Sequence, residues 1–103
     1  MASLTRDPNF LPRFHVVMKT DQELPPNFVV KLLMEVFYLS QQDAQDLAIP
    51  ILSHRTTYYG NYTKEVAEYK VFELSQQVIR QGRQLDSHFE TISFPNGIAS
   101  ARF

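Results

Sequence analysis

The N-terminal part of the chain alternates between apolar and polar side chains over residues 14–19, where Phe14, Val16 and Met18 fall on one side. A period of two residues is typical of a β-strand that places one face against a core. After this segment the apolar residues recur every three or four positions, which is typical of amphipathic helices. Such spacing covers residues 26–37, 40–51 and 63–82. The pattern therefore predicts a strand, two consecutive helices and, later in the chain, a long third helix.

The predicted helix ends depend on residue types that favour helix termini. The Pro25–Pro26 pair suits a first turn, where the missing N–H of proline costs nothing. Ser40 and Thr63 are of the type that caps a helix N-terminus through the side-chain oxygen. Gly82 suits the residue after a C-terminus. Pro50 removes one backbone hydrogen bond, so we expect it to kink or end the second helix.

Two further segments have the composition of strands. Thr56–Tyr62 is rich in threonine and tyrosine and is interrupted by Gly60, which predicts a bend or a bulge. His88–Phe94 forms the last predicted strand. The predicted order is therefore βααβαβ. Because every helix has one apolar face, we expect an α+β single-domain sandwich in which three helices pack on one face of a small three-stranded antiparallel sheet.

Length and composition indicate one compact domain. The chain has 103 residues, of which 44% are hydrophobic and 20% are charged, a balance typical of globular proteins. Residues 1–12 and 94–103 carry little periodicity. We therefore expect a flexible N-terminal arm, a folded domain over residues 13–93 and a loose C-terminal tail.

Net charge and missing sequence signals narrow the possible partners. A formal net charge of −1 provides no overall field that would attract nucleic acid or an anionic membrane. The chain has no cysteine, no secretory signal pattern and no apolar run of about 18 residues. We therefore expect a cytoplasmic protein that binds neither nucleic acid nor membranes and recognises its partners through shape and local chemistry.

Catalytic and metal-binding motifs are missing from the sequence as well. It contains no glycine-rich phosphate loop and no G-x-S-x-G elbow, and His15, His54 and His88 lack the paired spacing of zinc ligands. Asp21 and Glu23 could share a face as a carboxylate pair, although loop solubility and helix N-terminal charge explain them better. We expect no enzyme activity, no metal and no cofactor.

Two stretches of the sequence give the chain a family resemblance. KTDQELPPNF (19–28) joins the first strand to a helix that opens with Phe28 and Val29. GNYTKEVAEYKV (60–71) resembles the signature G-x-[FY]-x-x-E-x-A-E-x-K-V of the ClpS family. The resemblance extends without gaps from Phe14 to Glu90. It implies an adaptor that docks on the N-terminal domain of a Clp-type AAA+ unfoldase, similar to ClpA, and modulates which protein or peptide substrates with N-terminal degrons reach the protease.

The resemblance also implies a pocket in which hydrogen-bond acceptors hold an α-amino group and an apolar cavity holds the first side chain. The family's Asn-Asp-Asp loop falls on Thr20, Asp21 and Gln22, and its amine-binding histidine falls on Leu52. Because acceptors are lost, we expect weakened or altered recognition of N-terminal degrons. A two-residue shift would bring His54 to the position of Leu52. The implied pocket residues are Thr20, Asp21, Gln22, Leu24, Pro26, Val29, Ile51, Leu52 and Leu85.

Glu65 and Lys70 match the charged residues through which the family contacts the unfoldase. Their positions near the start of the third helix predict that both face solvent. Solvated helix charges without a specific partner are the simpler interpretation of the same pattern. In the alternative function, the chain is a structural or regulatory interaction module that keeps the ClpS fold while serving another complex.

Overall fold

The computed structural model describes residues 12–92, which fold into a sheet and a set of helices. The elements are β1 (Phe14–Lys19), α2 (Pro26–Phe37), α3 (Gln41–Leu52), β2 (Thr57–Tyr62), α4 (Lys64–Arg80) and β3 (Asp86–Thr91). The predicted order βααβαβ is confirmed. The predicted arm and tail fall almost entirely on residues 1–11 and 93–103, which lie outside the described residues, as does Phe94 at the end of the predicted last strand.

The sheet has the strand order β2-β1-β3, and both neighbouring pairs are antiparallel. Phe14 pairs with Tyr62 and Val16 pairs with Tyr59, so three steps along β2 correspond to two steps along β1. The extra residue forms the bulge that the sequence predicted around Gly60. The φ angle of Gly60 is +95°, a conformation that glycine adopts without steric cost.

Two details of the strands differ from the sequence prediction. β3 begins at Asp86, before the predicted start at His88, because Asp86 still pairs with Lys19. Val17 occupies a position on the outer face of β1, yet it is only 3% exposed. It lies on the central strand and pairs with Tyr58 on one side and His88 on the other, so flanking side chains can shield it.

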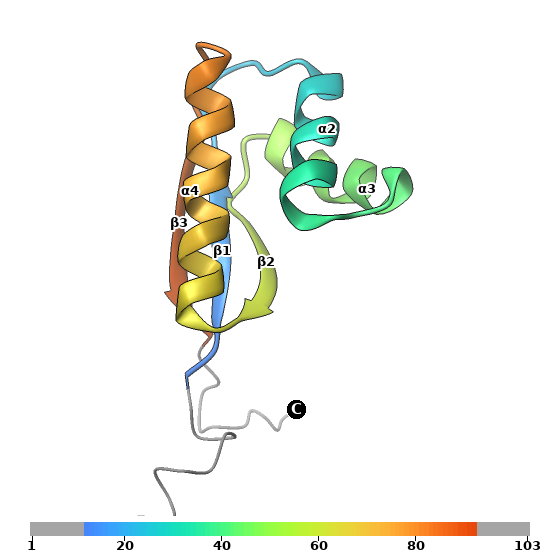
Figure 1. Ribbon diagram of the computed structural model, residues 1–103. Coiled ribbons are helices and arrows are strands. Elements are labelled where there is room, and N and C mark those ends of the chain that lie inside the picture. Colours follow the sequence, from blue (N-terminus) through green and yellow to red (C-terminus); the bar gives the residue numbers. More distant parts are fainter. Residues whose placement is uncertain (1–11, 93–103) are drawn as a thin grey trace, which may run out of the picture.

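The helices share one core with the inner face of the sheet. α4 runs along the sheet, whereas α2 and α3 form a pair in which α2 contacts α4 and α3 contacts β2 (Figure 1). The core cluster combines Val16 and Met18 of β1 with residues from all three helices, including Leu33, Ile51 and Leu74. The α+β sandwich predicted from the sequence is therefore confirmed.

The helices begin at the positions that the capping residues predicted. The Ser40 hydroxyl accepts the Asp43 N–H at 3.1 Å, and the Thr63 hydroxyl accepts the Val66 N–H at 3.3 Å. Pro25 precedes α2 as its N-cap residue. Within residues 12–92, none of the helices combines the length and the apolar character needed to cross a bilayer.

Pro50 lies inside α3, which continues to Leu52. Pro50 has no N–H and so loses the one backbone bond to the Asp46 carbonyl, and only two residues of the helix follow it. Its carbonyl accepts the N–H of Ser53 at 3.2 Å and that of Arg55 at 2.9 Å. Pro50 therefore marks the last turn of the helix rather than its final residue.

Candidate functional site

Hydrogen bonds centred on Thr20 and Gln22 hold the loop between β1 and α2. Thr20 is buried, and its hydroxyl donates to the Gln84 carbonyl at 2.8 Å and accepts the N–H of Gln22 at 3.0 Å. The Gln22 Oε1 atom accepts the N–H of Gln84 at 2.9 Å. These bonds attach the loop to the segment that precedes β3. Two of the three side chains at the predicted amine-binding loop are therefore bonded to Gln84.

Asp21 and Glu23 do not form a carboxylate pair, because each has its own partner. Asp21 Oδ1 lies 3.2 Å from Lys19 Nζ, and Glu23 Oε2 lies 3.0 Å from His54 Nε2. Both carboxylate side chains are open to solvent, with exposed fractions of 94% and 93%. The loop thus presents two accessible acidic groups on either side of the Gln22 side chain.

His54 joins the C-terminal end of α3 to the same loop. Its Nδ1 lies 2.9 Å from the Thr20 carbonyl oxygen, and its Nε2 lies 3.0 Å from the Glu23 carboxylate. The φ angle of His54 is +64°, in the left-handed region. Histidine is enriched there among residues other than glycine. The hydrogen bond to the Thr20 carbonyl, followed by that to Glu23, raises the pKa of His54 above its usual value. The sequence interpretation missed this contact, which no local motif signals.

Apart from Pro26, the apolar residues of the predicted pocket lie in the core or against it. Three are buried members of the core cluster: Leu24, Val29 and Ile51. Two are half-buried and pack against that cluster: Leu52 and Leu85. Pro26 is exposed at the first residue of α2. The structure thus attaches the predicted apolar residues to one core, while the pocket itself stays a prediction.

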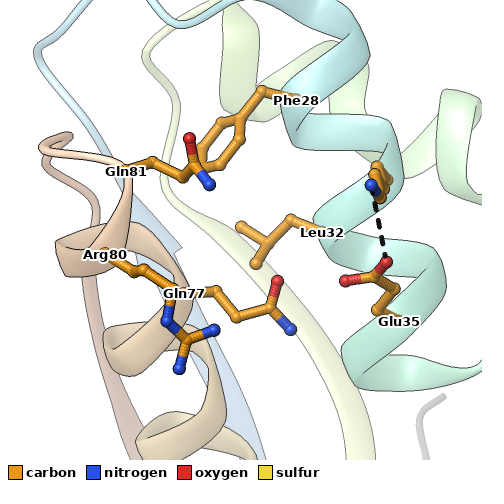
Figure 2. Close-up of a pocket in the computed structure, with 7 residues that line it drawn as sticks. Phe28, Leu32, Glu35, Gln77, Arg80 and Gln81 are labelled. Carbon is orange, nitrogen blue, oxygen red and sulfur yellow. Dashed lines mark ion pairs between the residues drawn. The ribbon is translucent and has the colours of Figure 1, made fainter.

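One cavity near this region has a volume of about 230 Å³ and lies between α2 and α4. Figure 2 shows Phe28 and Leu32 of α2 facing Gln77 and Gln81 of α4 across it. The ion pair between Lys31 and Glu35, 4.0 Å long, borders the same cavity. Its lining is mixed polar and apolar and includes neither Val29 nor Leu52.

A second cavity of about 320 Å³ borders Leu85 near the C-terminal end of α4. Val78 and Ile79 supply its apolar side, and Arg83 and Asp86 supply charged groups. Leu52 is not part of its lining. Leu85 is therefore the one predicted pocket residue that lines either of these two cavities.

Lys70 points into the protein, which corrects the expectation that it faces solvent. It is only 8% exposed, and its Nζ donates to the Val36 carbonyl at 2.7 Å. The same ammonium lies 4.5 Å from the centroid of the Tyr38 ring. Position 70 falls on the helix face that also buries Ala67 and Leu74. Glu65, in contrast, is exposed in the first turn of α4.

The other histidines lie on the outer face of the sheet. His88 Nε2 lies 2.8 Å from Glu90 Oε2, and His15 Nε2 lies 3.9 Å from Glu90 Oε1. In the part of the chain that the structure describes, no group of three or more histidine and acidic side chains is arranged to hold a metal ion.

A small antiparallel sheet covered by helices, with an acidic loop tied to the end of α3, defines the chain as a single α+β domain. The chain belongs to the ClpS family. The family model described as "ATP-dependent Clp protease adaptor protein ClpS" matches residues 11–88.

Individual relatives support this assignment. The chain is 34% identical over 79 residues to the ATP-dependent Clp protease adapter protein ClpS of Desulforapulum autotrophicum, with 77% of this chain and 76% of that protein covered. It is 32% identical over 88 residues to the corresponding protein of Neisseria meningitidis serogroup B, with 82% and 86% covered.

A solved structure shares the fold. The structure of Agrobacterium tumefaciens ClpS2 bound to L-phenylalaninamide superimposes with a TM-score of 0.71 at 21% sequence identity. The comparison covers 79% of this chain and 99% of that one.

Proposed function

We propose that this protein is a cytoplasmic Clp protease adaptor that docks on the N-terminal domain of a Clp-type AAA+ unfoldase and modulates substrate choice. Membership of the ClpS family over residues 11–88 supports the adaptor role. We further propose that recognition of N-terminal degrons is weakened or altered. The observation that carries this second part is Leu52, an apolar side chain at the end of α3 where the family's amine-binding histidine is expected.

The engagement of the loop side chains supports altered recognition. An ammonium group needs hydrogen-bond acceptors around it. Thr20 and Gln22 already bond to Gln84, and Leu52 has no acceptor atom. Asp21 is the matching loop residue with an exposed carboxylate. Each charge-assisted hydrogen bond contributes about 1.5–3 kcal/mol, so each lost acceptor should weaken the binding of a free amine by roughly 10- to 150-fold.

Peptide titration tests this part of the proposal. L-phenylalaninamide binds the Agrobacterium tumefaciens relative, so it and peptides that begin with Phe or Leu are suitable probes. We expect the parent chain to bind free and N-acetylated peptides with affinities within about tenfold of each other, since few acceptors distinguish them. The double variant Leu52→His, Gln22→Asp should gain at least about tenfold for the free amine alone.

Two control variants separate the effect of new acceptor atoms from the effect of changed side-chain shape. Leu52→Met keeps an apolar side chain of similar volume, and Gln22→Asp alone measures the cost of losing the bond to Gln84. Leu52→Met should not distinguish the free from the acetylated peptide, whereas Gln22→Asp, which restores one acceptor, should favour the free amine less than the double variant does. If the double variant also binds both forms equally, Leu52 and Gln22 do not belong to an amine site, and this part of the proposal is wrong.

A charge reversal on α4 tests the docking part. Glu65 is exposed, whereas Lys70 is engaged with Val36, so Glu65 is the predicted contact that can be changed without disturbing the core. Glu65→Lys should weaken binding to the isolated unfoldase N-terminal domain about tenfold, whereas Asp46→Lys on α3 should leave it unchanged. Both affinities can be measured by surface plasmon resonance. A parent chain without affinity for such a domain would contradict the proposal.

The burial of Lys70 favours a second candidate function. It withdraws one of the two expected docking charges from the surface, as expected for a regulatory interaction module that keeps the fold but serves another complex. In that case the parent chain would fail to bind the unfoldase domain, although it would remain folded and carry an intact Glu65.

A further inference from the structure

The outward face of α4 carries an apolar stripe that the adaptor proposal does not use. We define the α4 stripe as Tyr69, Phe72, Gln76 and Ile79. Tyr69 is 56% exposed, Phe72 57% and Ile79 70%, and Gln76 is exposed as well. Figure 1 shows α4 in front of the sheet, with α2 and α3 to one side. Residues 12–92 therefore leave this face of the helix uncovered.

The spacing of the α4 stripe is that of a helix–helix contact. Its members follow one another at intervals of three, four and three residues, which places them in one row along the helix. A cavity of about 320 Å³ lies beside the row, lined by Tyr69, Phe72, Glu73, Gln76, Gln77 and Arg80. All six lining residues belong to α4, so this is an open groove between side chains of one helix, next to the aromatic rings.

The charges at the two ends of the α4 stripe are opposite in sign. Glu65 lies one turn before Tyr69, at the N-terminal end, and Glu68 lies beside Tyr69, so the acidic side chains there outnumber Lys64 at the first residue of the helix. Arg80 follows Ile79 at the C-terminal end. When two copies of such a helix lie antiparallel, the acidic end of each meets the basic end of the other, and the apolar rows face each other. In a parallel pair, like charges would meet at both ends.

We propose that the α4 stripe is the interface of a homodimer in which the α4 helices of two copies pair antiparallel across a two-fold axis. Tyr69 of each copy then packs near Gln76 and Ile79 of the other, and Phe72 of each copy packs against the groove beside the stripe of the other. Glu65 and Arg80 form reciprocal ion pairs at the two ends. The face fits a second copy because its apolar pattern and its charges are both self-complementary.

The size of the surface sets the expected strength. α4 has 17 residues, which corresponds to a length of about 25 Å. A contact confined to one helix per copy buries less than the roughly 1,200 Å² at which standard stable interfaces begin. The dimer is therefore reversible, with a dissociation constant in the micromolar range or above.

Dimerisation has a consequence for docking, and this step alone depends on the proposed function. Glu65 is the predicted unfoldase contact, and it also borders the N-terminal end of the α4 stripe. A second copy on α4 therefore covers part of the surface that the unfoldase needs, so the two partners compete. The free adaptor would be stored as a dimer at high concentration and would dock as a monomer.

Sedimentation velocity on the full chain, over concentrations of about 5–500 µM and without unfoldase, tests the dimer directly. We expect a concentration-dependent shift from monomer to dimer. Phe72→Glu should raise the dissociation constant at least tenfold, because both copies lose an aromatic contact at the centre of the interface. Ile49→Glu, on the exposed surface of α3, is the matched control and should leave the dimer unchanged.

Charge reversal distinguishes the orientation of the helices. Glu65→Arg and Arg80→Glu should each weaken the dimer, and the double reversal should restore it, since the antiparallel pair then has the same ion pairs with exchanged ends. A chain that stays monomeric throughout, or a dimer that Phe72→Glu does not weaken, overturns the proposal. If Phe72→Glu instead lowers affinity for the unfoldase domain while the parent is monomeric, the stripe belongs to that partner. The dimer is then refuted and the adaptor function stands.

Discussion

Lys70→Met tests the inward direction of the Lys70 side chain through the stability of the fold. The change removes a charged donor from a buried position and keeps an unbranched side chain of similar length. The lost hydrogen bond, from Nζ to the Val36 carbonyl at 2.7 Å, has a charged donor and contributes about 1.5–3 kcal/mol. The cation–π contact with Tyr38, at 4.5 Å from the ring centroid, contributes about 0.5–1 kcal/mol.

A second effect of Lys70→Met opposes these losses. The parent keeps an ammonium group at a site that is only 8% exposed, and removing it recovers part of the cost of desolvating a charge. The Val36 carbonyl, near the C-terminal end of α2, remains without its donor. We therefore expect a net loss of about 1–3 kcal/mol in the free energy of unfolding. For a domain of this size, that is a large part of a total of roughly 5–15 kcal/mol.

Urea denaturation followed by circular dichroism measures the change. With a slope of about 1–1.5 kcal/mol per M, the midpoint should fall by roughly 0.7–3 M. Lys64→Met, at the exposed first residue of the same helix, is the matched control and should stay within about 0.5 kcal/mol of the parent. A Lys70→Met variant as stable as this control would refute the inward role of Lys70. Under conditions where the variant is folded, its affinity for an unfoldase domain should match that of the parent.

Two further predictions concern backbone strain and pH. Gly60→Ala should lose about 2–4 kcal/mol, because φ is +95° and the new Cβ would overlap the Tyr62 ring. Gly82→Ala, at φ +68° in open space, should lose about 1–2 kcal/mol, and equal losses in the two urea transitions would contradict this reasoning. The raised pKa of His54 means that its contribution to stability is fully present below the unfolded pKa of about 6.5 and is lost as the pH rises through the folded pKa. Asparagine tolerates the left-handed backbone at this position, so the stability difference between the parent and His54→Asn should be largest near pH 6 and smaller at pH 8.5. A difference that does not change with pH would contradict the contact with Glu23.

The order of the elements followed from the sequence because short-range chemistry decides it. The Ser40 and Thr63 caps bond to N–H groups three residues away, and the alternation in β1 needs only the period of a strand. Gly60 predicted the bulge in β2 from residue type alone. Even so, the exact start of β3 at Asp86 depended on a partner strand, since pairing with Lys19 extends it.

The candidate site was less accessible to sequence reasoning. The family pattern gave the positions of four candidate residues, Thr20, Asp21, Gln22 and Leu52. It could not show that Gln84 forms hydrogen bonds with two of these side chains. The 3-4-3 spacing of the α4 stripe was present in the sequence. The same helix carries a second, buried row with similar spacing, and the pattern alone does not say which row meets the core.

The sequence by itself determined the helices, the strands, their caps and the family, because these depend on residues that are close together along the chain. The tertiary structure decided the direction of Lys70, the attachment of the acidic loop by His54 and the exposure of the α4 stripe. Lys70 and Val36 are separated by 34 residues, as are His54 and Thr20. A hydrogen bond of under 3 Å between such partners exists only after the core has brought their elements together, so no local pattern can specify it.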